Sequence, residues 1–368
     1  MNEWHLVANT AEIPSPALLI YPERVRENVR AMIRIVGSAE RLRPHVKTHK
    51  MTELVRMQLE MGINKFKCAT IAEAEMAAAA GARDVLIAYQ MVGPNQARLL
   101  ELSQKYPGTA FSCITDNTDN VDALARLFSS AGCTLDVLLD VDCGQHRTGI
   151  EPGVQAVELY RRLASSPGLR PGGIHAYDGH VTEPDLARRA ALFDAALAPV
   201  QAFREELLHA GLPVPRVVAG GLPTFPLHAK SPAVECSPGT CVLWDFGYSD
   251  KYPDLPFLHA ALVLTRVVSR PSPNRLCLDL GHKAIAAENP HPRVRLLELP
   301  DATFVAHNEE HIVIESNRAG QFAVGDCLYG IPRHVCPTVA LYSEATVVRN
   351  GRATESWRVT ARERRLTI

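Results

Sequence analysis

The sequence lacks the features that would hold a protein in a membrane or export it. It has no run of about 20 apolar residues, the length that a helix needs to cross a bilayer. The opening segment, MNEWHLVANTAEIP, contains acidic side chains and no apolar core, so we do not expect a signal peptide. The nine cysteines are an odd number without paired spacing, which suits a reducing compartment better than a disulfide framework. We therefore expect a cytoplasmic protein that no membrane holds.

Excess charge of either sign is also missing. The formal net charge is −1, with 21% charged and 46% hydrophobic residues, which is an ordinary composition for a globular protein. A nearly neutral chain offers no basic surface to nucleic acid or anionic lipid, so we expect its partner to be a small molecule held in a pocket. At 368 residues, the chain is long enough for two domains, or for one large barrel with a domain attached.

Strand-like and helix-like segments alternate as far as residue 219. Eight short apolar runs predict strands at residues 17–20, 42–46, 65–68, 85–88, 110–114, 136–141, 173–177 and 217–219. Helices are expected between them, at residues 23–36, 52–61, 71–80, 95–105, 117–131, 153–164 and 184–210. This alternation favours parallel strands in an α/β fold, and a closed (β/α)8 barrel leaves no sheet edge exposed. An open doubly wound sheet is the alternative, but the glycine-rich turn that such folds use for dinucleotides is missing after Ile20.

The pattern changes after residue 235. Strands are expected at residues 260–269, 275–280, 294–299, 311–315, 326–329, 345–349 and 355–359, separated by turns rich in Gly, Asn and Pro and by no long helix. This pattern is typical of a mainly antiparallel β domain. We therefore divide the chain into a barrel at residues 14–235 and a C-terminal β domain at residues 236–368, which residues 1–13 could complete.

A basic segment follows the second predicted strand. It reads RPHVKTHK at residues 43–50. Barrel enzymes carry their reactive groups at the carboxyl ends of strands. A lysine that is desolvated at such a position has a lowered pKa and becomes a nucleophile toward an aldehyde. Lys47 is therefore the candidate nucleophile, and a solvated basic loop is the alternative.

Two further strand ends carry candidate functional groups. The segment DCGQHRTG follows the strand at residues 136–141, and its glycines would let the backbone approach a planar ligand while Arg147 meets an anionic oxygen. The strand that ends at Tyr177 is followed by Asp178 and His180, which are candidate acids and bases.

Two glycine turns lie at the end of the predicted barrel. They read GGLPT at residues 220–224 and PGT at residues 238–240. Backbone N–H groups and the Thr224 hydroxyl could bind a phosphate there, and the second turn repeats the pairing of a glycine with a hydroxyl. The last strands of a barrel are a frequent phosphate position. Turns without a ligand are the alternative.

The β domain contains a motif that could bind a metal ion, HVCPT at residues 334–338. In an extended segment, residues two apart point to the same face, so the imidazole of His334 and the thiolate of Cys336 could share one ion. Two protein ligands would leave coordination positions open for substrate and water. A chance histidine beside a buried cysteine is the alternative.

Taken in order, these motifs resemble the D-threonine aldolase and D-serine dehydratase family, pyridoxal-phosphate enzymes of fold type III related to alanine racemase. The resemblance extends from residue 14 to residue 346 and is carried by RPHVK, the segment 144–149, the glycine pair at 220–221 and HVCPT. It implies a barrel with a β domain, the cofactor pyridoxal 5'-phosphate and a divalent metal ion (zinc, manganese, cobalt or magnesium). We also expect a homodimer.

The resemblance implies a role for each candidate residue. Lys47 would hold the cofactor's aldehyde as a Schiff base, Arg147 would face its phenolic oxygen, and Tyr177 would lie near its ring. The positions that match phosphate-binding residues, with Thr224 as a further candidate, are Gly220, Gly221, Gly239 and Thr240. His334 and Cys336 match the two protein ligands of the metal.

The sequence departs from the aldolases of this family in two places. Their metal pair is typically His-Xaa-Asp, whereas the dehydratases resemble the His-Xaa-Cys of this chain, and a thiolate favours zinc-like ions over magnesium. The aldolases also carry a histidine at the position of Asp178, which is thought to take the proton from the substrate's β-hydroxyl. In this chain, Asp178 or His180 would have to take it.

The resemblance implies a lyase that acts on D-configured β-hydroxy-α-amino acids. It does not decide which bond of the substrate the enzyme breaks. We favour retro-aldol cleavage to glycine and an aldehyde. The alternative is dehydration of D-serine or D-3-hydroxyaspartate to a 2-oxo acid and ammonia, with Lys47 removing the α-proton. A pyridoxal-phosphate-binding protein without turnover is a weaker alternative, because the small carriers with this barrel lack the β domain.

Overall fold

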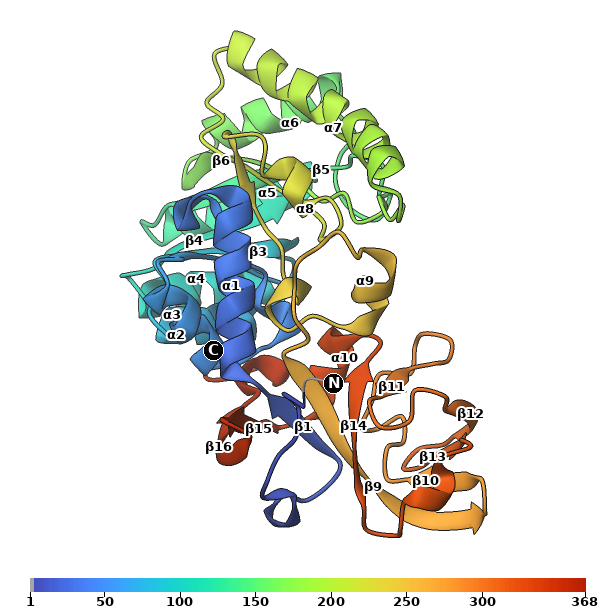
Figure 1. Cartoon of the computed structure of the whole chain (residues 1–368). Helices are drawn as coiled ribbons and strands as arrows, with labels where there is room; N and C mark the ends of the chain where they lie inside the picture. Colours follow the sequence, from blue (N-terminus) through green and yellow to red (C-terminus); the bar gives the residue numbers. More distant parts are fainter. Residues whose placement is uncertain (1–2) are drawn as a thin grey trace. The chain divides into compact units, whose positions relative to one another are not determined.

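The computed structural model describes residues 3–368, which fold as two compact units (Figure 1). The barrel unit comprises Met32–Lys47, Thr52–Gly239 and Glu363–Ile368. The β unit comprises the residues up to Ala31, Thr48–Met51 and Thr240–Arg362. Across the described residues, no helix combines the length and the apolar character that crossing a membrane requires.

The barrel unit is built on a parallel sheet whose strands follow the order of the chain. They are β2 (Lys65–Cys68), β3 (Asp84–Gln90), β4 (Ala110–Thr115), β5 (Leu135–Val141), β6 (Leu169–Ala176), β7 (Val217–Ala219) and β8 (Val234–Cys236). The helices of this unit are α2 (Thr52–Glu60), α3 (Ile71–Ala79), α4 (Pro94–Lys105), α5 (Thr118–Ser130), α6 (Val154–Ser165), α7 (Leu186–His209) and α8 (Phe225–His228). A helix between each pair of parallel strands is the expected βαβ arrangement.

The segment that precedes α2 closes this sheet into a ring. Leu42 forms a parallel bridge to Cys236 of β8, and His45 forms one to Lys67 of β2, so the segment joins both edge strands. The run predicted as a strand at residues 42–46 therefore fills the eighth position of the barrel. Closure of the ring confirms the barrel and excludes the open doubly wound sheet.

The β unit contains a mixed sheet that is mostly antiparallel. Its main path runs β12 (Thr303–His307), β13 (Ile312–Glu315), β10 (Arg275–Leu278), β9 (Ala261–Ser272), β1 (Ala17–Ile20), β15 (Glu344–Arg349) and β16 (Arg352–Arg358). Strand β14 (Cys327–Pro332) pairs with β9 and with β11 (Val294–Leu296). The remaining helices are α1 (Pro22–Val36), whose residues are divided between the two units, α9 (Phe246–Lys251) and α10 (Val335–Leu341).

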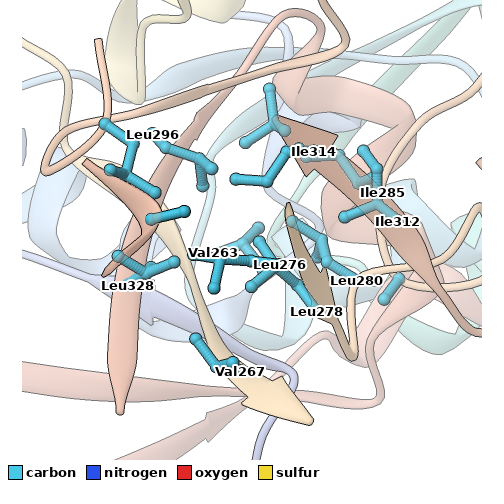
Figure 2. Close-up of a cluster of buried hydrophobic side chains, with 14 residues drawn as sticks. Val263, Val267, Leu276, Leu278, Leu280, Ile285, Leu296, Ile312, Ile314 and Leu328 are labelled. Atoms are coloured by element: carbon cyan, nitrogen blue, oxygen red, sulfur yellow. The ribbon is translucent and has the colours of Figure 1, made fainter. Parts of the chain in front are cut away.

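Alternate residues of these strands form a hydrophobic core in the β unit, which Figure 2 shows. Leu276 and Leu278 of β10 and Ile312 and Ile314 of β13 meet there, because residues two apart on a strand share a face. Val263 of β9 joins them. Strand β14 also contributes to this core and leads into α10, so the core fixes the part of the chain that carries the predicted metal pair.

The prediction that residues 17–20 form the first barrel strand is wrong. They form β1, which pairs with β9 and β15 in the sheet of the β unit. The barrel instead uses β8, which the sequence analysis did not assign. All four residues of β1 are buried, and a short run of this kind does not reveal which sheet it joins. Strand β8 has only three residues and includes Glu235, so its apolar pattern is too weak to predict a strand.

Candidate active site

A cavity of about 550 Å³ opens at the carboxyl ends of the barrel strands, a size typical of small-molecule sites. Its lining includes the polar side chains of Lys47, Lys67, Asp140, Arg147, His175 and Tyr177. The fold therefore brings Lys47, Arg147 and Tyr177, which are far apart in the sequence, into one cavity. This is the end of a barrel at which reactive groups are expected.

Lys47 reaches the cavity from the short 3-10 turn η3 (Val46–Thr48), which follows the segment that closes the barrel. Its backbone N–H donates to Nδ1 of His45 over 3.3 Å. The position of the lysine is thus fixed by the barrel wall itself and not by a free loop.

A buried ion network anchors this part of the wall. The guanidinium of Arg43 is inaccessible to solvent and donates to both oxygens of Asp84, at 2.7 and 2.8 Å, and to Glu235 at 2.8 Å. Burial opposes the charge of Arg43, but hydrogen bonds and the negative charges of these two carboxylates raise its pKa. Arg43 therefore ties the closing segment to β3 and β8 and holds Lys47 at the cavity.

The loop that carries Arg147 is shaped by Asp142. One carboxylate oxygen of Asp142 accepts hydrogen bonds from the backbone N–H groups of Gly144, at 2.9 Å, and His146, at 3.1 Å. Gly149 adopts a φ of +99°, and a Cβ atom there would lie 2.7 Å from the backbone nitrogen of Asp142. Only glycine fits this turn, which returns the chain to the barrel after Arg147.

Tyr177 lies between two cationic side chains of the cavity. Its ring centroid is 5.2 Å from Cζ of Arg147 and 5.7 Å from Nζ of Lys67. Both distances fall within the range of cation–π contacts. The tyrosine therefore helps to hold both cations at the cavity.

Asp140 and His175 form a buried pair that the sequence analysis missed. Oδ1 of Asp140 accepts a hydrogen bond from Nδ1 of His175 over 2.7 Å, and both side chains are almost completely buried. Burial lowers the pKa of His175 more than Asp140 raises it, so the imidazole is neutral near pH 7 and its Nε2 carries a lone pair. That Nε2 is buried and has no hydrogen-bond partner. A carboxylate inside the apolar run LDVLLDV was the available signal for this pair.

Lys67 is the second functional residue that the sequence analysis missed. It points inward from β2, and its amine donates to Oγ of Ser237 over 2.6 Å. Burial, followed by the positive charge of Lys47, lowers the pKa of Lys67 to about 7. The strand KFKC is only four residues long and carries two lysines, so nothing in the sequence distinguishes Lys67 from a charged residue exposed to solvent.

Asp178 is directed away from this cavity. Its Oδ2 pairs with Nε2 of His228 over 2.8 Å, and its Oδ1 accepts a hydrogen bond from the backbone N–H of Gly221. Burial raises the pKa of Asp178, but the hydrogen bond and charge of His228, followed by the Thr224 hydroxyl, lower it by more. Asp178 is not part of the cavity lining, and neither is His180, which is exposed and lies beside the Arg147 loop at Gly144.

The predicted phosphate positions are divided between two turns. Gly220 follows β7 with a φ of +117°, and the hydroxyl of Thr224 donates to the carbonyl of Gly221 over 3.2 Å. Thr240 begins the 3-10 turn η4 (Thr240–Val242), and its hydroxyl lies 3.4 Å from Sγ of Cys336. The hydroxyls of Thr224 and Thr240 therefore both have protein partners.

His334 and Cys336 meet, although the segment is not extended as the sequence analysis assumed. His334 is the N-cap of α10, and Cys336 lies in the first turn of that helix. The two side chains hydrogen-bond to each other, which outweighs burial and lowers the pKa of the thiol. Nδ1 of His334 lies 2.5 Å from Oε1 of Glu288. A carboxylate on one ring nitrogen is the usual support of a metal-binding histidine and leaves Nε2 for an ion.

The residues of the cavity fit the cofactor that the resemblance implies. The cavity has the size for a pyridine cofactor, an amine for its aldehyde, and an unpartnered buried nitrogen on His175 for a polar atom of a ligand. Within residues 3–368, no three His, Cys, Asp or Glu side chains are grouped to hold a metal ion. The donor atoms of His334 and Cys336, an imidazole nitrogen and a thiol with a lowered pKa, are of the kind that zinc-like ions bind, and two such ligands would leave open positions.

The chain is similar to known proteins over nearly its whole length. A family model for the N-terminal domain of alanine racemase matches residues 20–242, and one described as a putative serine dehydratase domain matches residues 260–348. The D-threonine aldolase of Arthrobacter sp. is 31% identical over 96% of this chain and 93% of its own length. The D-threo-3-hydroxyaspartate dehydratase of Delftia sp. is 25% identical over 94% of this chain and 97% of its own.

Solved structures give the same result for the fold. The crystal structure of D-threonine aldolase from Filomicrobium marinum superposes with a TM-score of 0.89, at 28% identity and with 96% of each chain covered. The match includes both the barrel and the β unit.

Proposed function

This chain belongs to the D-threonine aldolase and D-serine dehydratase family of pyridoxal-phosphate lyases, and we propose that it cleaves D-β-hydroxy-α-amino acids to glycine and an aldehyde. The observation that carries the proposal is the cavity in which the barrel brings Lys47 and Arg147 together. Full-length similarity to a D-threonine aldolase supports the choice of reaction.

In this proposal, Lys47 would hold the aldehyde of pyridoxal phosphate, and Arg147 would bind its phenolic oxygen. The residues that would hold its phosphate are Gly220, Gly221, Gly239 and Thr240, with Thr224 as a further candidate, and Tyr177 would contact the ring. When bound, the cofactor withdraws electrons from the bond that breaks at the substrate's α-carbon. The protein orients the substrate so that the Cα–Cβ bond is the one that breaks.

We assign the removal of the hydroxyl proton to His180 rather than to Asp178. The carboxylate of Asp178 is buried, and its oxygens are occupied by His228 and by the backbone N–H of Gly221, so it has little capacity for a further proton. We assign Asp178 a positioning role, because it fixes the Gly221 turn. His180 lies outside the cavity lining, but its imidazole is exposed beside the Arg147 loop at Gly144, and an imidazole can serve as a general base.

His334 and Cys336 would hold a divalent ion. The thiolate favours a zinc-like ion over magnesium, and Glu288 keeps the imidazole of His334 oriented. An ion there would supply Lewis-acid chemistry, which lowers the pKa of a bound hydroxyl group.

Dehydration is the second candidate reaction. It is favoured by one observation, the His-Xaa-Cys pair formed by His334 and Cys336, and it is the reaction named for the Delftia relative. The same groups would act, but Lys47 would remove the α-proton and hydroxide would leave. A carrier without turnover is excluded, because the relatives that match along the full length are lyases.

Product analysis distinguishes the two reactions. The purified protein, loaded with pyridoxal phosphate, is incubated with D-threonine, D-serine and D-3-hydroxyaspartate, with and without a chelator. Glycine with an aldehyde supports the aldolase proposal, whereas ammonia with a 2-oxo acid contradicts it and supports dehydration. Activity that survives complete metal removal would argue against the proposed metal.

Borohydride trapping tests the assignment of Lys47. We expect the wild-type protein to give a reduced cofactor adduct on Lys47 and Lys47→Ala to lose both this adduct and the visible absorption of the bound cofactor. Lys230→Ala, which removes an exposed lysine, is the control and should behave as wild type. An unchanged spectrum in Lys47→Ala would refute the assignment.

A further inference from the structure

Lys67 is a buried cation whose charge is only weakly compensated. Its single hydrogen bond goes to Ser237, whose own hydroxyl donates to the carbonyl of Ala219 over 3.1 Å. Within the described chain, residues 3–368, Lys67 forms no ion pair, although Asp140 and Asp178 lie near enough to raise its pKa. A buried amine without a paired carboxylate is costly to the fold, so a function in the cavity is a better explanation for it than stability.

Lys67 shares the lining of the cavity with a polar atom that lacks a hydrogen-bond partner. His175 presents a buried, unpartnered Nε2, and the hydrogen bond of its Nδ1 to Asp140 fixes the orientation of the ring. Lys67, Asp140 and His175 all line the same cavity as Lys47. Buried polar atoms are nearly always paired in folded proteins, so this part of the cavity lining is suited to the polar edge of a bound molecule.

The chemistry of pyridoxal phosphate indicates which edge this is. Its phenolic oxygen, aldehyde and phosphate are attached through three adjacent ring carbons, and the proposed function assigns them to Arg147, Lys47 and the glycine turns. The ring nitrogen lies on the opposite edge of the ring. Of the polar side chains that line the cavity, we assign Lys67 and His175 to that edge, because the amine of Lys67 is held there by Ser237 and Nε2 of His175 has no hydrogen-bond partner. Ser237, the partner of Lys67, is two residues before Gly239 of the phosphate set.

We propose that Lys67 donates a hydrogen bond to the pyridine nitrogen of the bound cofactor, with His175 beside it on the same edge. This inference rests on the proposed function. A lysine amine is a donor toward an aromatic nitrogen, so the nitrogen acts as an acceptor and remains unprotonated. Lys67 thereby tunes the electron withdrawal by the ring while Lys47 holds the aldehyde.

Cofactor affinity, measured without turnover, tests the contact. The apo-protein is titrated with pyridoxal phosphate and with its deaza analogue, in which a C–H group replaces the ring nitrogen. We expect wild type to bind pyridoxal phosphate at least about tenfold more tightly than the analogue, the usual effect of a hydrogen bond that involves a charged group. Lys67→Met should lose this discrimination, and Lys65→Met, which removes the outer lysine of the same strand, should keep it.

Two further measurements decide the case if Lys67→Met is poorly folded. Ser237→Ala retains Lys67 and should keep the discrimination; its loss in a folded Ser237→Ala protein would assign the contact to the serine and overturn the inference. Nitrogen-15 NMR of labelled cofactor on the wild-type enzyme should report an unprotonated ring nitrogen near pH 7. A protonated nitrogen would overturn it.

The outcomes also separate this inference from the proposed function. Lys67→Met could lower the affinity for pyridoxal phosphate and for the deaza analogue by the same factor, or leave both affinities unchanged. If borohydride still places the adduct on Lys47 in that case, the inference fails and the proposed function stands. If Lys67→Met changes only the KM for a substrate, Lys67 binds substrate and the inference also fails. If the adduct lies on Lys67, the assignment of Lys47 and this inference fail together.

Discussion

At the scale of single residues, burial decides which polar groups are available for chemistry. Asp178 occupies the position that suggested a catalytic base, yet its oxygens are taken by His228 and by the backbone of Gly221. No motif in the sequence indicated Lys67 or His175 as functional residues, yet both line the cavity. Residue type and position at a strand end were therefore enough to predict that Lys47 reaches the cavity, but they did not identify the other polar groups around it.

Asp178→Asn tests the positioning role of this carboxylate. We expect the affinity for pyridoxal phosphate to fall about tenfold, because a neutral amide weakens the charge-assisted hydrogen bond that holds the Gly221 turn. The kcat of the fully loaded enzyme should change little. Titration of the apo-protein and kinetics at saturating cofactor measure the two effects, with the exposed Asp194→Asn as control. Slow turnover at unchanged affinity would instead return Asp178 to the role of a base.

At the scale of elements, turns position the functional groups as much as strands do. The Arg147 loop depends on the left-handed conformation of Gly149 and on the hydrogen bonds that Asp142 accepts. The His334–Cys336 pair depends on a helix start, although an extended segment had been expected. An N-cap has extended dihedral angles and the next residues are helical, so this turn also brings the two side chains together.

Gly149→Ala tests the turn that follows Arg147. A methyl group would lie 2.7 Å from the backbone nitrogen of Asp142, so the loop must shift and Arg147 must move with it. We expect pyridoxal phosphate to bind at least about tenfold more weakly, which corresponds to backbone strain of about 1–3 kcal/mol. Equilibrium titration of the apo-protein measures this effect. Gly108→Ala is the matched control, because that glycine has open space and no positive φ.

Cys336→Ala tests the metal pair at the start of α10. We expect bound metal, measured by elemental analysis, to fall together with lyase activity, because a single imidazole ligand cannot retain the ion. Cys336→Asp should restore metal binding but shift the preference toward harder ions such as manganese or magnesium. Cys133→Ala, in an exposed turn after α5, is the control. Full metal stoichiometry in Cys336→Ala would rule out the thiolate as a ligand.

At the scale of the whole molecule, long-range contacts build both units. The barrel unit closes through residues 42–45, which bridge to β2 and to β8 nearly two hundred residues later. The sheet of the β unit places β1 between β9 and β15, which come from the second half of the chain. Each unit therefore combines segments that are distant in the sequence.

Arg43→Met tests the ion network that closes the barrel. Removal of the guanidinium takes the buried partner from Asp84 and Glu235 and leaves them only Arg216 and Lys65, so we expect a loss of about 3 kcal/mol in the free energy of unfolding. The folded state lowers the pKa of both carboxylates, so their contribution is present at neutral pH and is lost as the solution is acidified below about pH 4. The variant should therefore lose less stability on acidification than wild type.

Urea unfolding at neutral and acidic pH measures both effects. Arg30→Met is the control, because Arg30 forms an exposed pair on a helix that contributes little to stability. Equal acid sensitivity of Arg43→Met and wild type would contradict the role given to the network.

The sequence by itself determined the alternation of strands and helices, the change to a β pattern near residue 235, and the order of the motifs around Lys47, Arg147 and the glycine turns. These features are local, because they depend on residue type and on spacing along one segment. They were sufficient to predict the barrel fold and the family to which the chain belongs.

The tertiary structure decided which sheet β1 joins, which residues share the cavity with Lys47, and that Asp178 pairs with His228. The physical reason is that a period of two along a strand assigns a side chain to one of two faces but does not identify its neighbours across the barrel. Ring closure brings Lys67, Asp140 and His175 together, and burial then fixes their partners and protonation.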